Sequence, residues 1–277
     1  MRFLVYSHLY IAFCAVAMTA ETIVLFNINL RERIPYLSMV FFATLVAYNF
    51  KGIRFLFFEE KDADSDKKKW AIQNKFILLG VGLTSFIILI TVFFFVRKNA
   101  LLWLIPLGLL SLGYSYPIAI GKNRIVIREL PFIKTLLVAL VWATVVGYIP
   151  FAVSGLPVNK LWVLIEFLFL FSLAVLFDIK DIHSDHTNNI KTVPLAIGIR
   201  GTKILSITIL SIRIALVYFL MHFTKLFVSE LVITLISIAC ISKYVKKETP
   251  EFFYMIWIDG LMIGKFLISL LVSAYFI

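Results

Sequence analysis

Charged side chains are scarce in this chain of 277 residues. They make up 16% of it, whereas hydrophobic residues make up 61% and the mean hydropathy is +0.97. This excludes an ordinary soluble domain and predicts a polytopic membrane protein. Cysteine is rarer still, because Cys14 and Cys240 are the only two and both lie in apolar runs. The sequence therefore excludes a disulfide framework and a thiolate zinc site, and we expect both cysteines to be small buried residues.

Acidic residues are also few, with 16 Asp and Glu against 27 Lys and Arg and a formal net charge of +11. In a membrane protein this excess reflects topology and attraction to anionic lipid, so it does not indicate nucleic-acid binding. Most Lys and Arg outside the apolar runs fall on the side of the N-terminus and the loops after even-numbered spans. The positive-inside rule places these parts in the cytoplasm, below an inner or plasma membrane. No feature points to an obligate protein partner.

Long apolar runs predict an all-α fold that crosses the bilayer repeatedly. Arg2 and the run after it imitate a signal peptide, but the run continues to Phe26, which favours an uncleaved first span. Pro106 and Pro150 lie within runs, where kinks are expected. We expect one domain, 1–277, with nine transmembrane helices around a central cavity, at 3–26, 34–58, 71–96, 100–118, 131–154, 159–177, 201–221, 225–242 and 251–275.

Three aspartates follow the sixth apolar run, where it meets a polar loop. Asp178, Asp181 and Asp185 are spaced i, i+3 and i+7, which places them on one face of a helix. Like charges this close repel one another unless a cation lies between them. Mg²⁺ is such a cation, because it binds through a few carboxylates together with substrate phosphates. The alternative is a solvated acidic helix end.

A cationic loop follows the fourth apolar run. Tyr114 precedes Pro117, and Lys122 and Arg124 come soon after. Such a loop beside a carboxylate and metal site suits a diphosphate, because Lys and Arg bind the phosphate oxygens that the metal leaves free. The alternative is that these cations follow the positive-inside rule and anchor the helix ends.

The segment that begins with the three aspartates and continues with Thr192, Pro194 and Gly198 resembles the second aspartate motif of the UbiA superfamily of intramembrane prenyltransferases. The segment from Tyr114 to Arg124 resembles the part of that family after its fourth helix. The resemblance implies an all-helical fold and Mg²⁺-dependent binding of a polyprenyl diphosphate. It further implies transfer of the prenyl group to an acceptor, often an aromatic acid, a quinone precursor or haem, with the three aspartates as catalytic and metal-binding residues.

The family's first aspartate motif is degenerate here. Asn49 is kept, but Phe50, Ile53 and Phe57 occupy the three aspartate positions. Three interpretations stay open. Lys51 and Arg54 grip the diphosphate directly, or the acidic residues at 59–66 substitute, or the protein has lost transfer and only binds prenyl lipid. Within this resemblance we predict that the diphosphate contacts Asn49, Lys51, Arg54, Tyr114, Lys122 and Arg124.

Two further predictions concern the membrane interior. An apolar cavity lined by Trp142, Phe167, Phe169 and Phe171 suits an allylic cation, because aromatic faces stabilise a cation and exclude water. Charged residues within apolar runs are costly and are functional candidates. They also leave a small-molecule transporter open as a less favoured function. These residues are Glu21, Glu166, Arg213, Glu230, Asp259 and Lys265.

Overall fold

The computed structural model describes most of the chain, with only the backbone described at some positions. The described ranges are 1–29, 33–58, 66–96, 98–113, 117–120, 123–127, 130, 132–187, 190–221, 224–246 and 248–275. Helices dominate these ranges. They are α1 (Arg2–Tyr6), α2 (Leu9–Leu25), α3 (Arg33–Phe58), α4 (Asp66–Gln73), α5 (Lys75–Phe93), α6 (Lys98–Gly113), α7 (Ile133–Ala143), α8 (Ile149–Ser154), α9 (Lys160–Lys180), α10 (Ile182–Thr187), α11 (Val193–Met221), α12 (Lys225–Tyr244), α13 (Glu251–Phe253) and α14 (Asp259–Tyr275).

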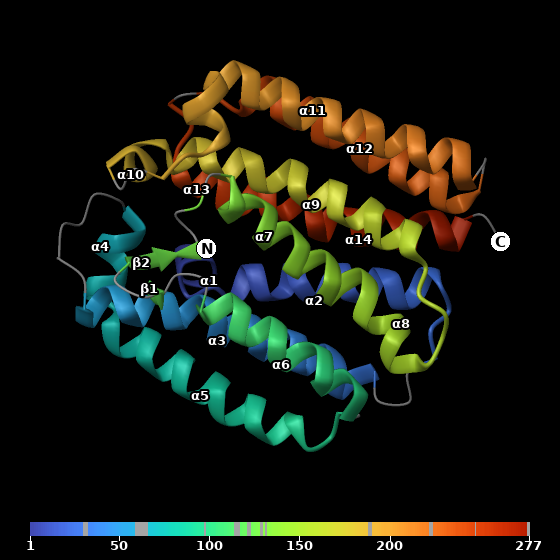
Figure 1. The fold of residues 1–277 in the computed structure, drawn as a ribbon. Helices are drawn as coiled ribbons and strands as arrows, with labels where there is room; N and C mark the ends of the chain where they lie inside the picture. Colours follow the sequence, from blue (N-terminus) through green and yellow to red (C-terminus); the bar gives the residue numbers. More distant parts are fainter. Residues whose placement is uncertain are drawn as a thin grey trace.

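The long helices pack side by side in a closed ring. Helix α2 contacts α3 and α14, and the ring continues from α14 through α12, α11 and α9 to α7. Helix α6 closes it between α3 and the α7–α8 segment, while α5 packs outside α3. Figure 1 shows α5 at one edge and the α11–α12 pair at the other. This arrangement agrees with the expectation of helices around a central cavity.

Three predicted helices are interrupted. The first span breaks at His8, whose φ of 67° is left-handed, and the third breaks at Asn74 between α4 and α5. The fifth passes through a π-helical turn, Thr144–Tyr148, before Pro150. Proline has no N–H to donate to the preceding turn. The Tyr36 hydroxyl donates to the carbonyl of Val145 at 3.0 Å, so this part of the turn keeps a hydrogen bond.

A second π-helical turn, Tyr254–Ile258, joins α13 to α14. The hydroxyl of Tyr10 in α2 donates to the carbonyl of Ile256 at 2.9 Å, and the Cys14 thiol donates to the carbonyl of Asp259 at 3.4 Å. Helix α2 thereby stabilises the irregular backbone of its neighbour. Cys14 is buried as expected, and Cys240 is half-buried.

The predicted fourth span is too long at its C-terminal end. Helix α6 ends at Gly113, and Pro117–Ile120 and Asn123–Val126 form an antiparallel hairpin, β1 and β2. Proline cannot donate to a helix and is tolerated at the first residue of a strand, which fits its place here. The all-α expectation thus holds for the membrane part and misses this small hairpin.

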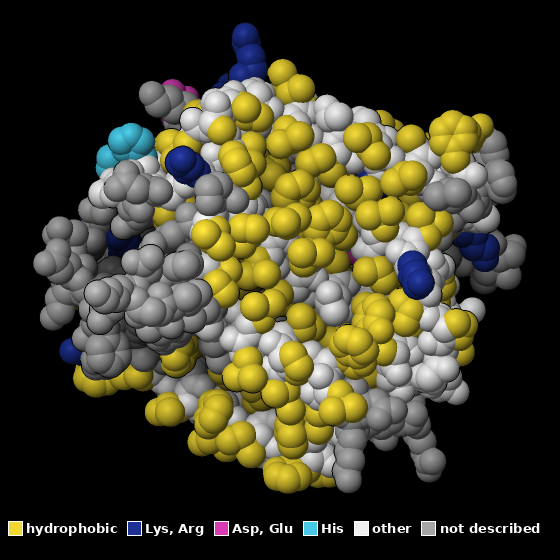
Figure 2. Space-filling model, in the orientation of Figure 1, with side chains coloured by type: hydrophobic (Ala, Val, Ile, Leu, Met, Phe, Trp, Pro, Cys, Tyr) yellow, Lys and Arg dark blue, Asp and Glu magenta, His cyan; other side chains and the backbone are white. Residues whose placement is uncertain are grey.

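Six helical segments are long and apolar enough to cross a membrane, while α2 and the 101–111 part of α6 are apolar but shorter. Nine crossings therefore stay a prediction. Figure 2 shows hydrophobic side chains spread over one face of the molecule, as a lipid-facing surface requires. The six segments are Lys75–Phe93, Ile133–Ser154, Lys160–Lys180, Val193–Phe219, Lys225–Tyr244 and Glu251–Tyr275.

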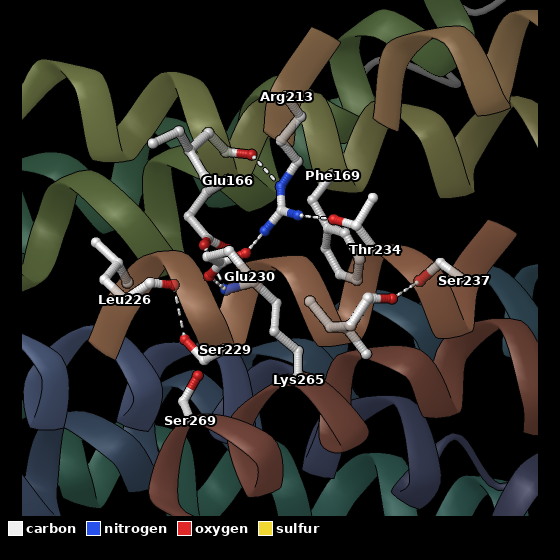
Figure 3. A network of polar contacts seen from close by, with 12 residues as sticks. Glu166, Phe169, Arg213, Leu226, Ser229, Glu230, Thr234, Ser237, Lys265 and Ser269 are labelled. Atoms are coloured by element: carbon white, nitrogen blue, oxygen red, sulfur yellow. Dashed lines mark hydrogen bonds and ion pairs between the residues drawn. The ribbon is translucent and has the colours of Figure 1, made fainter. Parts of the chain in front are cut away.

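A buried ionic network ties helices α2, α9, α12 and α14 together. Figure 3 shows its members on α9, α12 and α14. Lys265 Nζ lies 2.6 Å from Glu21 Oε2, 2.7 Å from Glu166 Oε1 and 3.0 Å from Glu230 Oε1. The hydroxyl of Ser269 donates to Glu21 Oε1 at 2.5 Å. Because an unpaired charge in this interior is costly, each member depends on the others.

Arg213 connects α11 to the same network. Its guanidinium pairs with Glu230 and donates to Thr234 Oγ1 at 2.9 Å and to the carbonyl of Ile165 at 3.2 Å. Its carbon Cζ lies 4.9 Å from the ring centre of Phe169. Five of the charged residues that the sequence marks inside apolar runs are thus structural partners of one another.

Candidate functional site

A cavity of about 240 Å³ lies between α2, α7, α9 and α14. Its polar end carries both charge signs, and its apolar wall includes an indole and a phenyl ring. Such a cavity suits an amphipathic ligand with an anionic head. The polar lining comprises Lys67, Lys134, Thr135, Asp178, Lys180, Asp181 and Asp259, and the apolar lining includes Trp142, Leu170, Leu173, Phe177, Met255 and Met262.

The three predicted aspartates lie on two helices, not on one continuous face. Asp178 is in the last turn of α9, Asp181 follows its end with φ −91° and ψ 1°, and Asp185 is in α10. The backbone N–H of Asp185 still donates to the carbonyl of Asp181 at 2.8 Å. This short link keeps the three carboxylates together, although the single helix face predicted for them is interrupted at Asp181.

A lysine occupies the point on which the carboxylates converge. Lys134 Nζ, from the first turn of α7, lies 2.8 Å from Asp185 Oδ2, 3.2 Å from Asp181 Oδ2 and 3.4 Å from Asp178 Oδ1. The Asp185 side chain is 1% exposed and that of Lys134 is 12% exposed. At the depth of Asp178 and Asp185 a carboxylate requires a positive partner, and this ammonium contacts both of them and Asp181 as well.

Two neighbours complete the shell. The hydroxyl of Thr135 donates to Asp178 Oδ2 at 2.5 Å, and Lys180 Nζ lies 2.8 Å from Asp181 Oδ1. Burial raises the pKa of Asp181, but the ammonium groups of Lys180 and Lys134 more than offset this and hold it at about 2. Asp181 is therefore ionised throughout the physiological range. Lys180 also lies 3.4 Å from Glu251 Oε1.

The residues present do not form a metal site in this arrangement. Within the described part of the chain, no group of three or more His, Cys, Asp or Glu side chains is placed to hold a metal ion. The ammonium of Lys134 fills the space between Asp178, Asp181 and Asp185. The metal role expected of the aspartates stays a prediction.

Lys67 adds a third cation to the cavity. It lies in the first turn of α4, a helix that contacts α1. Burial, and then the nearby ammonium of Lys180, lower its pKa to about 8, while Glu251, Asp181 and Asp259 oppose the shift. Lys67 is thus the cation of this cavity whose charge changes near physiological pH.

Among the predicted diphosphate contacts, Asn49 serves a structural purpose. It is buried, its amide donates to the carbonyls of Ser7 and Leu45, and its Oδ1 lies 3.2 Å from His8 Nδ1. It joins α3 to the break before α2. His8 is accordingly a buried histidine with a hydrogen-bond partner on α3. The other predicted contacts fall outside the described residues or side chains: Lys51, Arg54, Tyr114, Lys122 and Arg124, as do residues 59–65.

The aromatic lining is predicted only in part. Trp142 lines the cavity, as expected. Phe169 does not, because it is fully buried beneath Arg213 and Lys265, whose charged groups face its ring. Phe167 and Phe171 stack on each other with ring centres 5.6 Å apart and line neither of the two cavities described for this chain. Phe177, at the end of α9, takes the place expected of them.

A second cavity, of about 290 Å³, adjoins the first between α3, α5, α6 and α7. Tyr48, Val138 and Trp142 line both cavities and so form the wall between them. The second cavity is almost wholly apolar, with Leu89 and Phe93 among its lining residues. Together the two cavities provide a polar pocket continued by an apolar one.

Sequence reasoning missed Lys134, Thr135 and Lys180 as site residues. Lys134 and Thr135 follow Pro131 at the start of a predicted helix, and Lys180 lies between two of the aspartates. The sequence does contain a signal for them, because all three are polar residues close to a predicted helix end. Only the packing of α7 against α9 brings them to the carboxylates.

Comparison with known proteins places this site in a family. The UbiA prenyltransferase family matches residues 60–257. A UbiA homologue from Aeropyrum pernix K1, solved without ligand, has a TM-score of 0.61 at 14% identity, with 98% of this chain and 96% of that chain covered. A UbiA homologue from Archaeoglobus fulgidus was solved with DMAPP and Mg²⁺ and with GPP and Mg²⁺. It gives TM-scores of 0.60 and 0.61 at 10% and 12% identity, with 99% of this chain and 100% of that chain covered.

No curated protein matches the chain in sequence. At these low identities the solved structures establish the shared fold alone. The family match is independent of them, and it includes the three aspartates and Lys134. Because that match extends over well more than half of the chain, the protein belongs to the UbiA prenyltransferase family.

Proposed function

We propose that the protein binds a polyprenyl diphosphate in the cavity between α2, α7, α9 and α14 and transfers its prenyl group to an apolar or aromatic acceptor. The observation that carries the proposal is the amphipathic cavity itself. Lys67, Lys134 and Lys180 line its polar end, and Trp142 and Phe177 line the remainder. A diphosphate requires cations, and a prenyl chain requires an apolar space that excludes water.

The chain's own residues account for the departure of the leaving group. The allylic C–O bond breaks, and its electron pair moves to the diphosphate. Ammonium groups at the polar end stabilise the charge that develops there, in a site with little water to screen it. Asp178, Asp181 and Asp185 hold Lys134 in place. The aspartates thus position a cation, whether or not a metal also binds.

The apolar wall accounts for the allylic cation that remains. Trp142, Tyr48 and Phe177 present aromatic rings to the cavity. Aromatic faces attract a cation, and their bulk keeps water from capturing it. The acceptor then forms a bond to this carbon and loses a proton. The family resemblance favours an aromatic acid or a quinone precursor as the acceptor.

Mg²⁺ is the cofactor that the family resemblance suggests, and the Archaeoglobus fulgidus homologue was solved with it. In this chain a metal at the three aspartates has to displace the ammonium of Lys134. The excess of Lys and Arg in the loops after even-numbered spans supports a cytoplasmic position for the polar end of the cavity. Membrane lipid surrounds the remainder of the protein.

A second candidate is a non-catalytic protein that binds prenyl lipid. It is favoured by the loss of the first aspartate motif and by the lysine that fills the second. Purified protein with DMAPP or GPP and a panel of aromatic acceptors distinguishes the two. Prenyl transfer by the wild-type protein that is reduced in Asp181→Asn and in Asp185→Asn supports the first candidate, an enzyme. Binding of GPP without transfer to any acceptor supports the second candidate, and wild-type transfer by both variants removes the aspartates from the mechanism.

A further inference from the structure

Asp259 is a buried carboxylate that the proposed function leaves unused. It is the first residue of α14, it is 8% exposed, and it lines the same cavity as Asp178. Among the residues that the structure describes, its side-chain oxygens make no hydrogen bond and no ion pair. Its backbone groups do have partners: the N–H donates to the carbonyls of Tyr254 and Ile256, and the carbonyl accepts from the Cys14 thiol. In this its side chain differs from the other buried acids in the part of the chain that the structure describes.

The backbone around Asp259 is built to hold it toward the cavity. It directly follows the π-helical turn Tyr254–Ile258, an irregularity that is often found at functional sites. Tyr10 and Cys14 of α2 hold the carbonyls of Ile256 and Asp259. Gly260 allows the close approach of α2, because a Cβ there would lie 2.7 Å from the Tyr10 hydroxyl oxygen.

The energetic cost of this carboxylate points to a ligand. A buried polar group without a partner lowers stability, and a buried charge lowers it further. The structure offers Asp259 no compensating contact among the described residues, although Lys67 of α4 and Lys180 of α9 line the same cavity. Tyr10 and Cys14 face it from α2, and Glu251 lies at the same end in α13. A group on the ligand is the partner that remains.

Prenyl transfer supplies such a group. We propose that Asp259 is the catalytic base that removes the proton from the acceptor. This inference rests on the proposed function. As the acceptor's nucleophilic atom forms its bond to the allylic carbon, the carbon–oxygen bond to the diphosphate has broken with its electron pair. The acceptor's proton moves to a carboxylate oxygen of Asp259, so the products are prenylated acceptor, diphosphate and protonated Asp259.

The other acids of the cavity are less suited to this step. Asp178 is held by Thr135 and Lys134, and Asp181 by Lys180 and Lys134. Each of these carboxylates is committed to a cation that the diphosphate requires. Asp259 lines the same cavity from α14 and is not committed in this way, so an acceptor bound in the cavity can reach its carboxylate.

The test compares Asp259→Asn and Asp259→Glu with wild type, and Glu166→Gln serves as a control because it removes a buried acid outside the cavity. GPP binding is measured separately from transfer to a series of phenols of decreasing pKa. We expect Asp259→Asn to lower kcat by about 100-fold or more and to leave GPP affinity within about twofold of wild type. We expect Asp259→Glu, which keeps a carboxylate, to retain part of the activity. The loss should shrink as the phenol becomes more acidic, because an ionised acceptor needs no base.

Three outcomes overturn the inference. A wild-type kcat in Asp259→Asn excludes Asp259 as the base. A loss of kcat that is the same for every phenol excludes it as well. A parallel loss of GPP binding assigns Asp259 to the fold or to the diphosphate site instead. Absence of transfer by the wild-type protein overturns the proposed function and this inference together, so the two failures are distinguishable.

Discussion

Lys134 Nζ lies 2.8 Å from Asp185 Oδ2, and the same ammonium contacts Asp178 and Asp181. One residue from the start of α7 thus contacts all three carboxylates of an acidic motif that extends from α9 into α10. In a sequence, three aspartates at this spacing indicate a metal. In the folded chain their partner is a lysine, which makes the site depend on how α7 packs against α9.

Removing this lysine should weaken the fold and open the site to metal. In Lys134→Met the three carboxylates lose a shared partner, so we expect a loss of about 3 kcal/mol in stability, measured as a lower Tm. We also expect tighter binding of Mn²⁺, a probe for Mg²⁺, measured by electron paramagnetic resonance. Lys134→Arg keeps the positive charge and is the control. Unchanged Mn²⁺ binding in Lys134→Met would contradict the role given to this ammonium.

Binding of inorganic diphosphate should weaken as pH rises. Lys67 has a folded pKa of about 8, below its ordinary value of 10.5, so it is charged below pH 8 and loses its proton above it. The cavity therefore loses a positive charge across this pH, and we expect affinity to fall roughly tenfold. Lys67→Arg stays charged and should flatten the profile. Titration calorimetry measures the affinity of both proteins at each pH. The ionisation of the diphosphate itself affects both proteins equally and cancels in the comparison. Identical dependence of affinity on pH in the two proteins would exclude Lys67 from the site.

Close packing of α14 against α2 should depend on Gly260 and not on Gly264. A Cβ at Gly260 would lie 2.7 Å from the Tyr10 hydroxyl oxygen, which donates to Ile256, whereas one at Gly264 has its nearest neighbour at 3.8 Å. We expect Gly260→Ala to cost about 1–3 kcal/mol and Gly264→Ala to be nearly neutral. Thermal unfolding in detergent measures both. Equal effects would show that this contact does not limit the packing.

The buried network should tolerate changes unequally. Lys265 contacts three glutamates, so Lys265→Met leaves buried charges without a partner and should cost about 3–5 kcal/mol. Glu166→Gln should cost much less, because Glu166 Oε2 has no hydrogen-bond partner among the described residues and an amide oxygen can replace Oε1. Tm values of the two variants make the comparison. A larger loss in Glu166→Gln would contradict this picture.

Trp142 should limit the length of the prenyl chain. It lines both cavities, so Trp142→Ala removes part of the wall between them. If the proposed function holds, we expect the ratio of kcat/KM for GPP to that for DMAPP to rise. Phe171→Ala removes an aromatic ring that lines neither cavity and is the matched control. An equal change in both variants would assign the effect to general loosening.

The sequence by itself determined the class of protein and the place of its acidic motif. Apolar composition required a membrane protein, and the run lengths located its helices to within a few residues at most ends. Breaks at His8 and Asn74 and the hairpin from Pro117 were not predictable. They depend on local backbone geometry that hydropathy does not encode. The aspartates, together with Thr192, Pro194 and Gly198, also carried the family resemblance, which the family match confirms.

Only the tertiary structure decided what these residues contact. Hydropathy and spacing identify residues on one helix, but they do not relate α7 to α9 or α2 to α14. Those contacts join residues far apart in sequence, and they bring Lys134 to the aspartates and Lys265 to three glutamates. The same packing leaves Asp259 unpaired at the cavity wall. A charge in a membrane interior is stabilised by its neighbours in space, so its role is decided when the helices pack.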